Sequence, residues 1–96
     1  MIVRIVKLTF LPGKTEEFLG LYRATHEKIK ASKGCSHLEL LYDIHNPDVL
    51  FTYSLWDSED DLLNYRSSEF FNYTWSRAKP LFAGEAEAWT LEKKIL

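Results

Sequence analysis

The chain has 96 residues, of which 46% are hydrophobic and 15% aromatic, and its formal net charge is -2. This length supports one hydrophobic core, so we expect a single domain over residues 1–96. The small net charge and the scattered basic residues argue against nucleic-acid binding. No run approaches the roughly 20 apolar residues of a membrane span, and no signal peptide is recognisable. We therefore expect a cytoplasmic protein that does not bind membranes.

The first third of the chain predicts a strand followed by a helix. Residues 2–10 are rich in β-branched and aromatic types and lead into a turn signal at Pro12-Gly13. Residues 14–33 carry apolar side chains at helical spacing, with glutamates early and lysines late, as the helix dipole favours. Gly34 then predicts the end of the helix.

The remainder predicts a hairpin, a divided helix and a last strand. Segments 36–43 and 48–56 contain β-forming residues and flank a turn signal at His45-Asn46-Pro47. Ser58 followed by Asp61 resembles a capping box and begins a helical region. This region breaks at Ser67-Ser68 and runs toward Pro80, and residues 85–95 form the last strand.

The predicted order is strand, helix, strand, strand, helix, strand. This order is typical of an α+β ferredoxin-like fold (βαββαβ), in which both helices cover one face of a four-stranded antiparallel sheet. The first strand nevertheless has apolar residues in both phases, for example Val6 and Leu8 in one and Val3 and Ile5 in the other. Since a wet face would alternate with polar residues, we expect a second copy to cover the open face, giving a homodimer. The alternative is a monomer with a partly apolar sheet.

Four short motifs in chain order carry a resemblance to a known family. They are Pro12-Gly13 after the first strand, Gly34-Cys35 before the second, Trp56-Asp57-Ser58 at the start of the helical region, and Ser68-Glu69-Phe70 within it. With these motifs the chain resembles the antibiotic biosynthesis monooxygenase (ABM) family over nearly its whole length. The resemblance implies a dimeric α/β barrel with a pocket in each subunit between sheet and helices.

The resemblance also implies candidate pocket residues. Trp56 matches a tryptophan that lines the pocket of phenol-oxidising relatives, whereas Thr52 and Leu62 replace their asparagine and tyrosine. Many relatives carry an acidic residue where this chain has Ser54.

Haem-degrading relatives need an asparagine, a tryptophan and a histidine ligand at the positions of Val6, Tyr65 and Trp75. All three differ, and no histidine follows His45, so we expect neither haem nor another cofactor. Val6 and Trp75 are instead candidate substrate contacts.

Other side chains suggest chemistry with less specificity. His26, His37 and His45 fit no short metal motif, and Cys35 has no partner, so no metal site is expected. His26 and His37 are candidate bases, although a helix-edge or solvent-facing histidine would also fit each position. Four arginines, namely Arg4, Arg23, Arg66 and Arg77, are candidate anion clamps or ordinary surface residues.

Two hypotheses follow for the function. The first is a cofactor-independent monooxygenase that acts on a small aromatic or quinol-type molecule in a dry pocket. In it His37 or His26 is the base, Tyr65 donates a hydrogen bond and Trp56 stacks on the substrate. The second is a non-catalytic ligand-binding or stress-related dimeric module with the same fold.

Overall fold

The strands and helices follow the predicted order in the computed structural model, which describes residues 1–96. The first half contains β1 (Ile2–Thr9), α1 (Thr15–Lys30), β2 (Cys35–Asp43) and β3 (Asn46–Trp56). The second half contains α2 (Glu59–Arg66), α3 (Glu69–Ala78), the short 3-10 helix η1 (Lys79–Leu81) and β4 (Glu87–Glu92).

Two serine side chains cap the helices of the second half. The Ser58 hydroxyl accepts a hydrogen bond from the backbone N–H of Asp61 at 3.2 Å, and the Ser68 hydroxyl accepts one from that of Phe71 at 3.1 Å. An N-cap serine fixes the start of a helix, because it satisfies an N–H group that has no partner within the helix. The predicted break between α2 and α3 is therefore confirmed, and Pro80 lies in η1, where α3 has ended.

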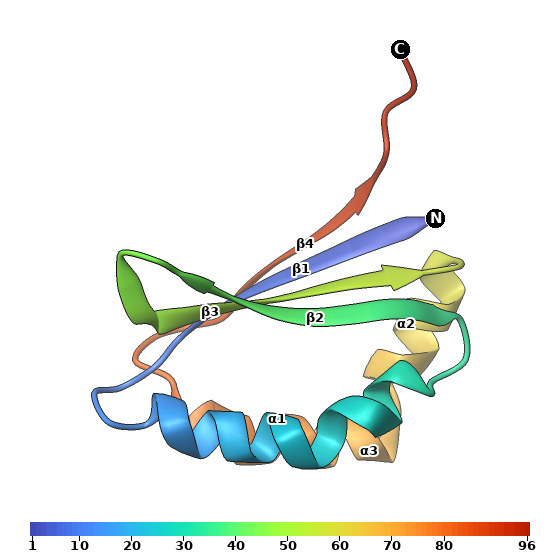
Figure 1. Cartoon of the computed structure of the whole chain (residues 1–96). Coiled ribbons are helices and arrows are strands. Elements are labelled where there is room, and N and C mark those ends of the chain that lie inside the picture. Colours follow the sequence, from blue (N-terminus) through green and yellow to red (C-terminus); the bar gives the residue numbers. More distant parts are fainter.

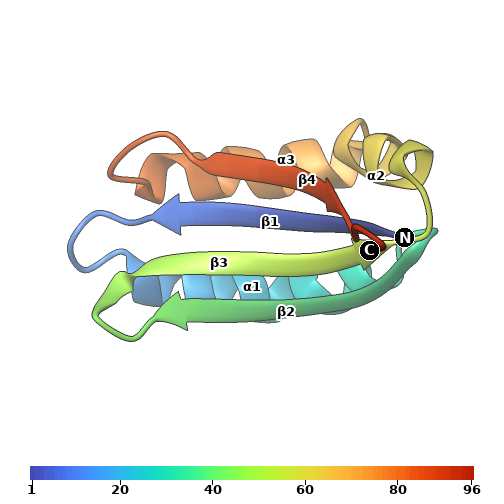
Figure 2. The same ribbon diagram turned by 90° about the horizontal axis from the view of Figure 1, so that it is seen from above.

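The four strands form one antiparallel sheet in the order β2-β3-β1-β4. β1 is a central strand, with Val6 opposite Thr52 of β3 and Ala88 of β4. Both α1 and α3 lie on the same side of this sheet (Figure 1), and the view from the other side shows the four strands uncovered (Figure 2). The ferredoxin-like α+β fold is thus confirmed, with its second helix divided into α2 and α3.

The turn between β2 and β3 lies slightly earlier than the sequence predicts. Asp43 pairs with Asn46, so the turn consists of the two residues between them, and Pro47 belongs to β3. The Asp43 carboxylate accepts a hydrogen bond from the His45 N–H at 2.8 Å, and the Asn46 side chain accepts one from the Asp48 N–H at 3.1 Å. These local bonds to the backbone favour a tight turn at this point.

Two other elements are shorter than predicted. α1 ends at Lys30, and the chain then turns through Ser32, whose carbonyl accepts a hydrogen bond from the Cys35 N–H at 3.0 Å. β4 covers only residues 87–92 of the predicted 85–95, and it ends at Glu92, opposite Ile2, where its partner β1 begins. In both cases the residue types would allow a longer helix or strand, but the element ends where its backbone groups no longer have hydrogen-bond partners.

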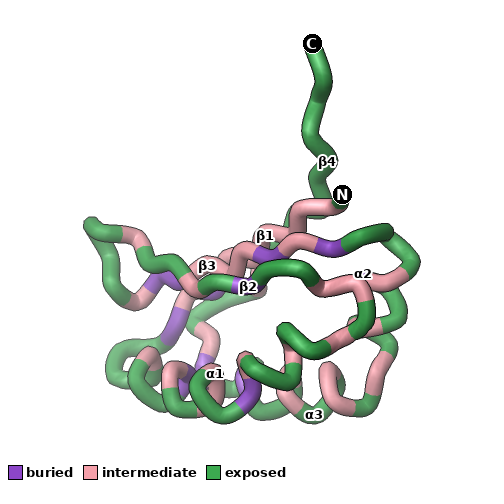
Figure 3. Tube along the Cα trace, turned by 45° about the vertical axis from the view of Figure 1, so that its right-hand side comes forward, coloured by how far each residue is buried: buried purple, intermediate pink, exposed green.

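The main core lies between the sheet and the helix layer, at the end of the sheet where β1 leaves it. Figure 3 shows buried residues both in the sheet and in the helix layer. The rings of Phe10, just after β1, and Phe18 of α1 are 4.7 Å apart between centroids and join the end of β1 to α1. The buried cluster consists of Leu8, Phe10, Phe18, Leu50, Ala78 and Leu81. Burial of such side chains is the main stabilising contribution to a fold of this size.

The opposite face of the sheet is apolar in its middle, has Lys7, Glu39 and Glu87 toward its edges, and is only partly buried. Ile5 of β1 lies between Tyr53 of β3 and Trp89 of β4, and Trp89 is 41% exposed. Val3, Phe51, Leu55 and Leu91 share the phase of these residues. We call these seven residues the open face. The apolar residues in both phases of β1 thus lie on the two faces of the sheet, as predicted, whereas dimerisation stays a prediction.

None of the helices combines the length and the apolar character that a membrane crossing requires. Cys35 is a free thiol and is half-buried. The cytoplasmic location stays a prediction.

Gly34 offers a test of how closely the loop before β2 packs on α2. Its φ of +84° disfavours any side chain, and an added Cβ would overlap Asp61. Gly13 has a similar φ of +81° but open space around it. We expect Gly34→Ala to lower the free energy of unfolding by about 2 kcal/mol more than Gly13→Ala does, since overpacking adds to the backbone cost. Urea unfolding of both variants measures the difference, and equal losses would contradict the close packing.

Candidate functional site

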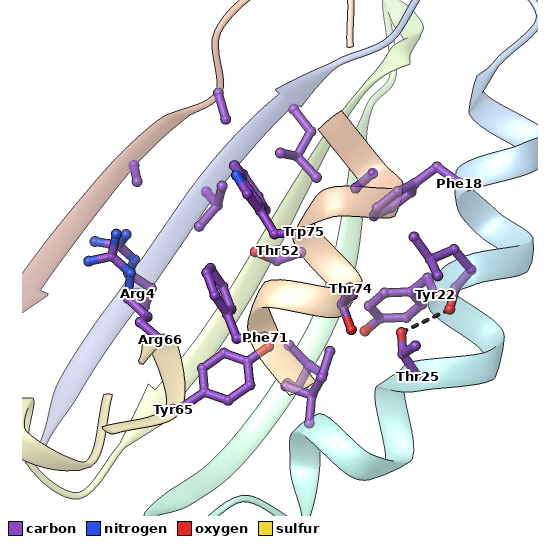
Figure 4. Close-up of a pocket in the computed structure, with 18 of the residues that line it drawn as sticks. Arg4, Phe18, Tyr22, Thr25, Thr52, Tyr65, Arg66, Phe71, Thr74 and Trp75 are labelled. Atoms are coloured by element: carbon purple, nitrogen blue, oxygen red, sulfur yellow. Dashed lines mark hydrogen bonds between the residues drawn. The ribbon is translucent and has the colours of Figure 1, made fainter. Parts of the chain in front are cut away.

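A cavity of about 260 Å³ lies between the sheet and the helix layer. It is next to the main core, and 14 of its 19 lining residues are hydrophobic. Aromatic side chains enter it from α1, α2 and α3, as Figure 4 shows for Tyr22, Tyr65, Phe71 and Trp75. An apolar cavity with a few polar groups is the usual form of a small-molecule site.

Five of the eight predicted site residues line this cavity. They are Val6, Thr52, Leu62, Tyr65 and Trp75. Strand geometry brings the first two together, because Val6 and Thr52 are opposite each other on neighbouring strands and their side chains leave the same face. These positions were obtained from the family resemblance, and their role in binding stays a prediction.

Trp56 does not line the cavity. It is only 1% exposed, and its indole N–H donates a hydrogen bond to the Ser54 hydroxyl at 3.0 Å. Its ring stacks on Tyr65 with 5.1 Å between centroids and 28° between planes. Tyr65 lines the cavity, so Trp56 packs against a residue of the cavity wall without lining the cavity itself. The predicted stacking of Trp56 on a substrate stays a prediction.

The candidate bases His26 and His37 both lie outside the cavity. His26 stacks on Tyr22 at 5.4 Å between centroids, and its Nδ1 is 3.6 Å from the Glu27 carboxylate. His37 is on β2, with its Nε2 3.6 Å from the Glu39 carboxylate. No three His, Cys, Asp or Glu side chains gather closely enough to bind a metal ion. The fold therefore does not bring either imidazole to the cavity wall.

The lining phenols stay protonated over the neutral range. Burial raises the pKa of Tyr65 to about 12, with a smaller contribution from Cys35. Burial also raises the pKa of Tyr22, and Glu39 adds to this shift. Both hydroxyls are consequently hydrogen-bond donors to a ligand rather than bases.

Four polar lining residues were missing from the predicted pocket, namely Arg4, Thr25, Arg66 and Thr74. Arg4 and Arg66 were two of four candidate anion clamps, and only these two line the cavity. The sequence alone could not distinguish Arg4 and Arg66 from the other two arginines, because β1 and the end of α2 come together only in the folded chain. Thr74 was not singled out, although it lies three residues after Phe71 and four before Ala78 on the apolar stripe of α3. A hydroxyl on such a stripe is a signal that sequence analysis can use.

The raised pKa of Tyr65 makes stability depend on alkaline pH. An unfolded tyrosine ionises near pH ~10, so the unfolded state loses this proton before the folded state does. We expect the free energy of unfolding to fall by about 1 kcal/mol between pH ~9 and ~11 because of this group.

Urea unfolding at several pH values measures the slope, which should be smaller in Tyr65→Phe. The matched control is Tyr73→Phe, which removes the phenol of a tyrosine that is 55% exposed. Identical slopes in wild type and Tyr65→Phe would contradict the assignment.

Comparison with solved structures identifies the same fold in several proteins. The crystal structure of an antibiotic biosynthesis monooxygenase has a TM-score of 0.92 and 18% identity, covering 99% of this chain and all of the other. A conserved protein from Methanosarcina mazei Go1 has a TM-score of 0.91 and 24% identity, covering 98% and 94%. A protein from Mycobacterium tuberculosis has a TM-score of 0.89 and 16% identity, covering 99% and 96%.

At these identities the structural likeness supports the fold alone. No curated protein sequence matches the chain. The family assignment comes from the sequence itself, because residues 1–74 match the family described as antibiotic biosynthesis monooxygenase. The chain therefore belongs to the antibiotic biosynthesis monooxygenase family.

Proposed function

We propose that the protein binds a small planar aromatic molecule of the phenol or quinol type and promotes its oxidation by dioxygen without a cofactor. The observation that carries this proposal is the aromatic-lined cavity, into which the neutral phenol of Tyr65 is directed. Membership of the family supports it. An apolar site of this kind excludes water and strengthens each electrostatic contact with the ligand.

The proposed reaction uses chemistry that an electron-rich phenol supplies itself. The phenol loses its O–H proton to solvent and one ring C–H hydrogen. One oxygen atom of O₂ becomes the second carbonyl of a quinone, and the other leaves as water. Tyr65 would donate a hydrogen bond to the ligand oxygen, and Phe71 and Trp75 would hold the ring. Val6, Thr52 and Leu62 would complete the wall.

A non-catalytic binding module is the second candidate. It is favoured by the position of His26 and His37 outside the cavity and by the raised pKa values of Tyr22 and Tyr65. With these side chains the wall has no group suited to accept a proton near neutral pH. The same cavity could then store or sense an aromatic ligand.

We also propose that two copies associate through the open face. Burial of Ile5, Tyr53 and Trp89 against a second sheet would remove apolar area from water, which favours association. The strands of this face have no covering layer in the single chain (Figure 1).

Oxygen uptake with a panel of dihydroxyaromatics tests the proposed reaction. We expect uptake above the protein-free rate, with a loss of at least about ten-fold in Tyr65→Phe because a donor to the oxyanion is removed. Ala88→Leu should lower affinity, since it narrows the cavity, whereas Ala83→Leu outside it should not.

His26→Ala and His37→Ala should retain uptake, and loss of uptake in these variants would support an imidazole base instead. No uptake across the whole panel, with ligand binding retained, would exclude the oxidation and favour the binding module.

Light scattering at micromolar concentration tests the association. We expect a mass of twice 11.3 kDa for the wild type. Phe51→Lys should shift the mass toward one chain, because it places a charge on the open face. Leu63→Lys, on an exposed position of α2, should leave the dimer intact. A wild-type mass of one chain would reject the dimer.

A further inference from the structure

Two arginine side chains lie together at one end of the cavity. Arg4 is on β1, and Arg66 is the last residue of α2. Both belong to the cavity wall, and Figure 4 shows them at the same end, next to Tyr65. A cavity with no other charged residue in its wall thus has a positive end.

No carboxylate neutralises this positive end. The ion pairs of the chain join Lys14 to Glu17, His26 to Glu27 and His37 to Glu39, and neither arginine takes part in one. No Asp or Glu lines the cavity. The side-chain hydrogen bond of Arg4 goes to a neutral group, from its Nη1 to the Thr90 hydroxyl at 2.7 Å.

The two charges act on each other. Burial lowers the pKa of Arg4, and the positive charge of Arg66 lowers it further. Arg4 remains a cation at neutral pH, since free arginine ionises far above it. Two like charges near each other are unfavourable, and an anion between them would relieve this repulsion.

The position of Arg4 is unusual for a structural residue. Its phase of β1 faces the helices and otherwise carries apolar side chains such as Val6 and Leu8. Arg66 in the last turn of α2 is favoured by the helix dipole, which needs no ligand. Arg4 has the Thr90 hydroxyl of the neighbouring strand as a neutral partner but has no carboxylate partner, so its charge remains available to an anionic ligand.

The rest of the cavity limits the shape of that ligand. Phe71 and Trp75 are nearly parallel, with 11° between planes and 5.8 Å between centroids, and Tyr65 meets Phe71 edge-on at 5.3 Å. These rings give this side of the cavity an aromatic surface on which a planar ligand can pack. The volume of 260 Å³ exceeds the roughly 150 Å³ in which an apolar cavity holds benzene. A ligand of one or two fused rings therefore fits.

A second polar group faces the same space from α3. The Thr74 hydroxyl oxygen is buried and has no hydrogen-bond partner in the protein. An unpaired buried hydroxyl is unfavourable, and a ligand oxygen at this end would satisfy it. Figure 4 shows Thr74 on the side of the cavity toward Tyr22, away from the arginines.

We infer that Arg4 and Arg66 bind the anionic oxygen of a planar aromatic ligand of one or two rings, either a phenolate or an aromatic carboxylate. The inference rests on the proposed function for the location of the ligand, but it does not require oxidation. If the anion is a phenolate, the pair also favours the deprotonated substrate, which the proposed reaction needs and which neither histidine is placed to produce.

The test compares an anion with its neutral isostere. Binding of 2-naphthoate and 2-naphthamide is followed by tryptophan fluorescence in wild type, Arg4→Gln and Arg66→Gln. We expect the wild type to bind the naphthoate at least about ten-fold more tightly, since a hydrogen bond to a charged group is a strong one. The ratio of the affinities for naphthoate and naphthamide should fall toward one in both glutamine variants, and it should stay high in Arg4→Lys, which keeps the charge.

Arg23→Gln is the matched control, because it removes the same charge from an exposed position of α1 outside the cavity. Arg66 is exposed at the end of a helix, so Arg66→Gln keeps the test valid if Arg4→Gln does not fold. Equal affinity for acid and amide, an unchanged preference in Arg66→Gln, or no binding of either compound would overturn the inference.

A chromogenic phenol separates the two sources of the anion. 4-Nitrophenol at a pH near its own pKa should gain phenolate absorbance on binding if the site takes phenolates, and this gain should disappear in Arg66→Gln. Preference for the naphthoate alone would assign the site to carboxylates. Since no assay here consumes oxygen, anion preference without oxygen uptake would reject the proposed reaction and leave the arginine site supported.

Discussion

The packing of the helix layer on the sheet at two separate points is the constraint that creates the cavity. At one end Phe10 and Phe18 hold α1 against β1, and the backbone N–H of Leu11 donates to the carbonyl of Leu81 at 2.9 Å, which fixes η1. At the other end Trp56 is buried under Tyr65 and fixes α2. Because both ends are anchored, the helices cannot collapse onto the middle of the sheet. Side chains in this middle part, such as Thr52 and Ala88, are too small to fill the gap.

The electrostatic character of the cavity follows from which groups are desolvated there. The Tyr65 phenol stays neutral because burial opposes its ionisation, whereas the guanidinium groups of Arg4 and Arg66 stay charged. Neutral hydroxyl donors and cations both stabilise negative charge on a ligand oxygen. With no carboxylate in the wall, a cationic ligand would find no anionic partner and would be repelled by the two arginines. The cavity is thus selective for the sign of charge as well as for shape.

Much of the fold could be predicted from the sequence, because local signals agree with the tertiary structure. Strand periodicity, the serine caps and the glycines at turns give the element order and the break between α2 and α3. The site was predicted less completely, because a cavity wall is a tertiary property. His26 follows Tyr22 by one helical turn and stacks on it, yet only Tyr22 lines the cavity. Trp56 has the right strand phase, but the ring of Tyr65 covers it.

The two faces of the sheet allow association and ligand binding to be separated. Neighbouring residues of one strand point to opposite faces, so Ile5 lies on the open face while Val6 lines the cavity. A change at Ile5 alters the surface offered to a second copy without touching a ligand, and a change at Val6 does the reverse. Family membership does not fix the reaction, since one fold hosts many activities. The identity of the ligand therefore depends on the residues that line the cavity. Arg4 is the most informative of them, because it shares the strand phase of Val6 and adds a charge to this otherwise apolar side of β1.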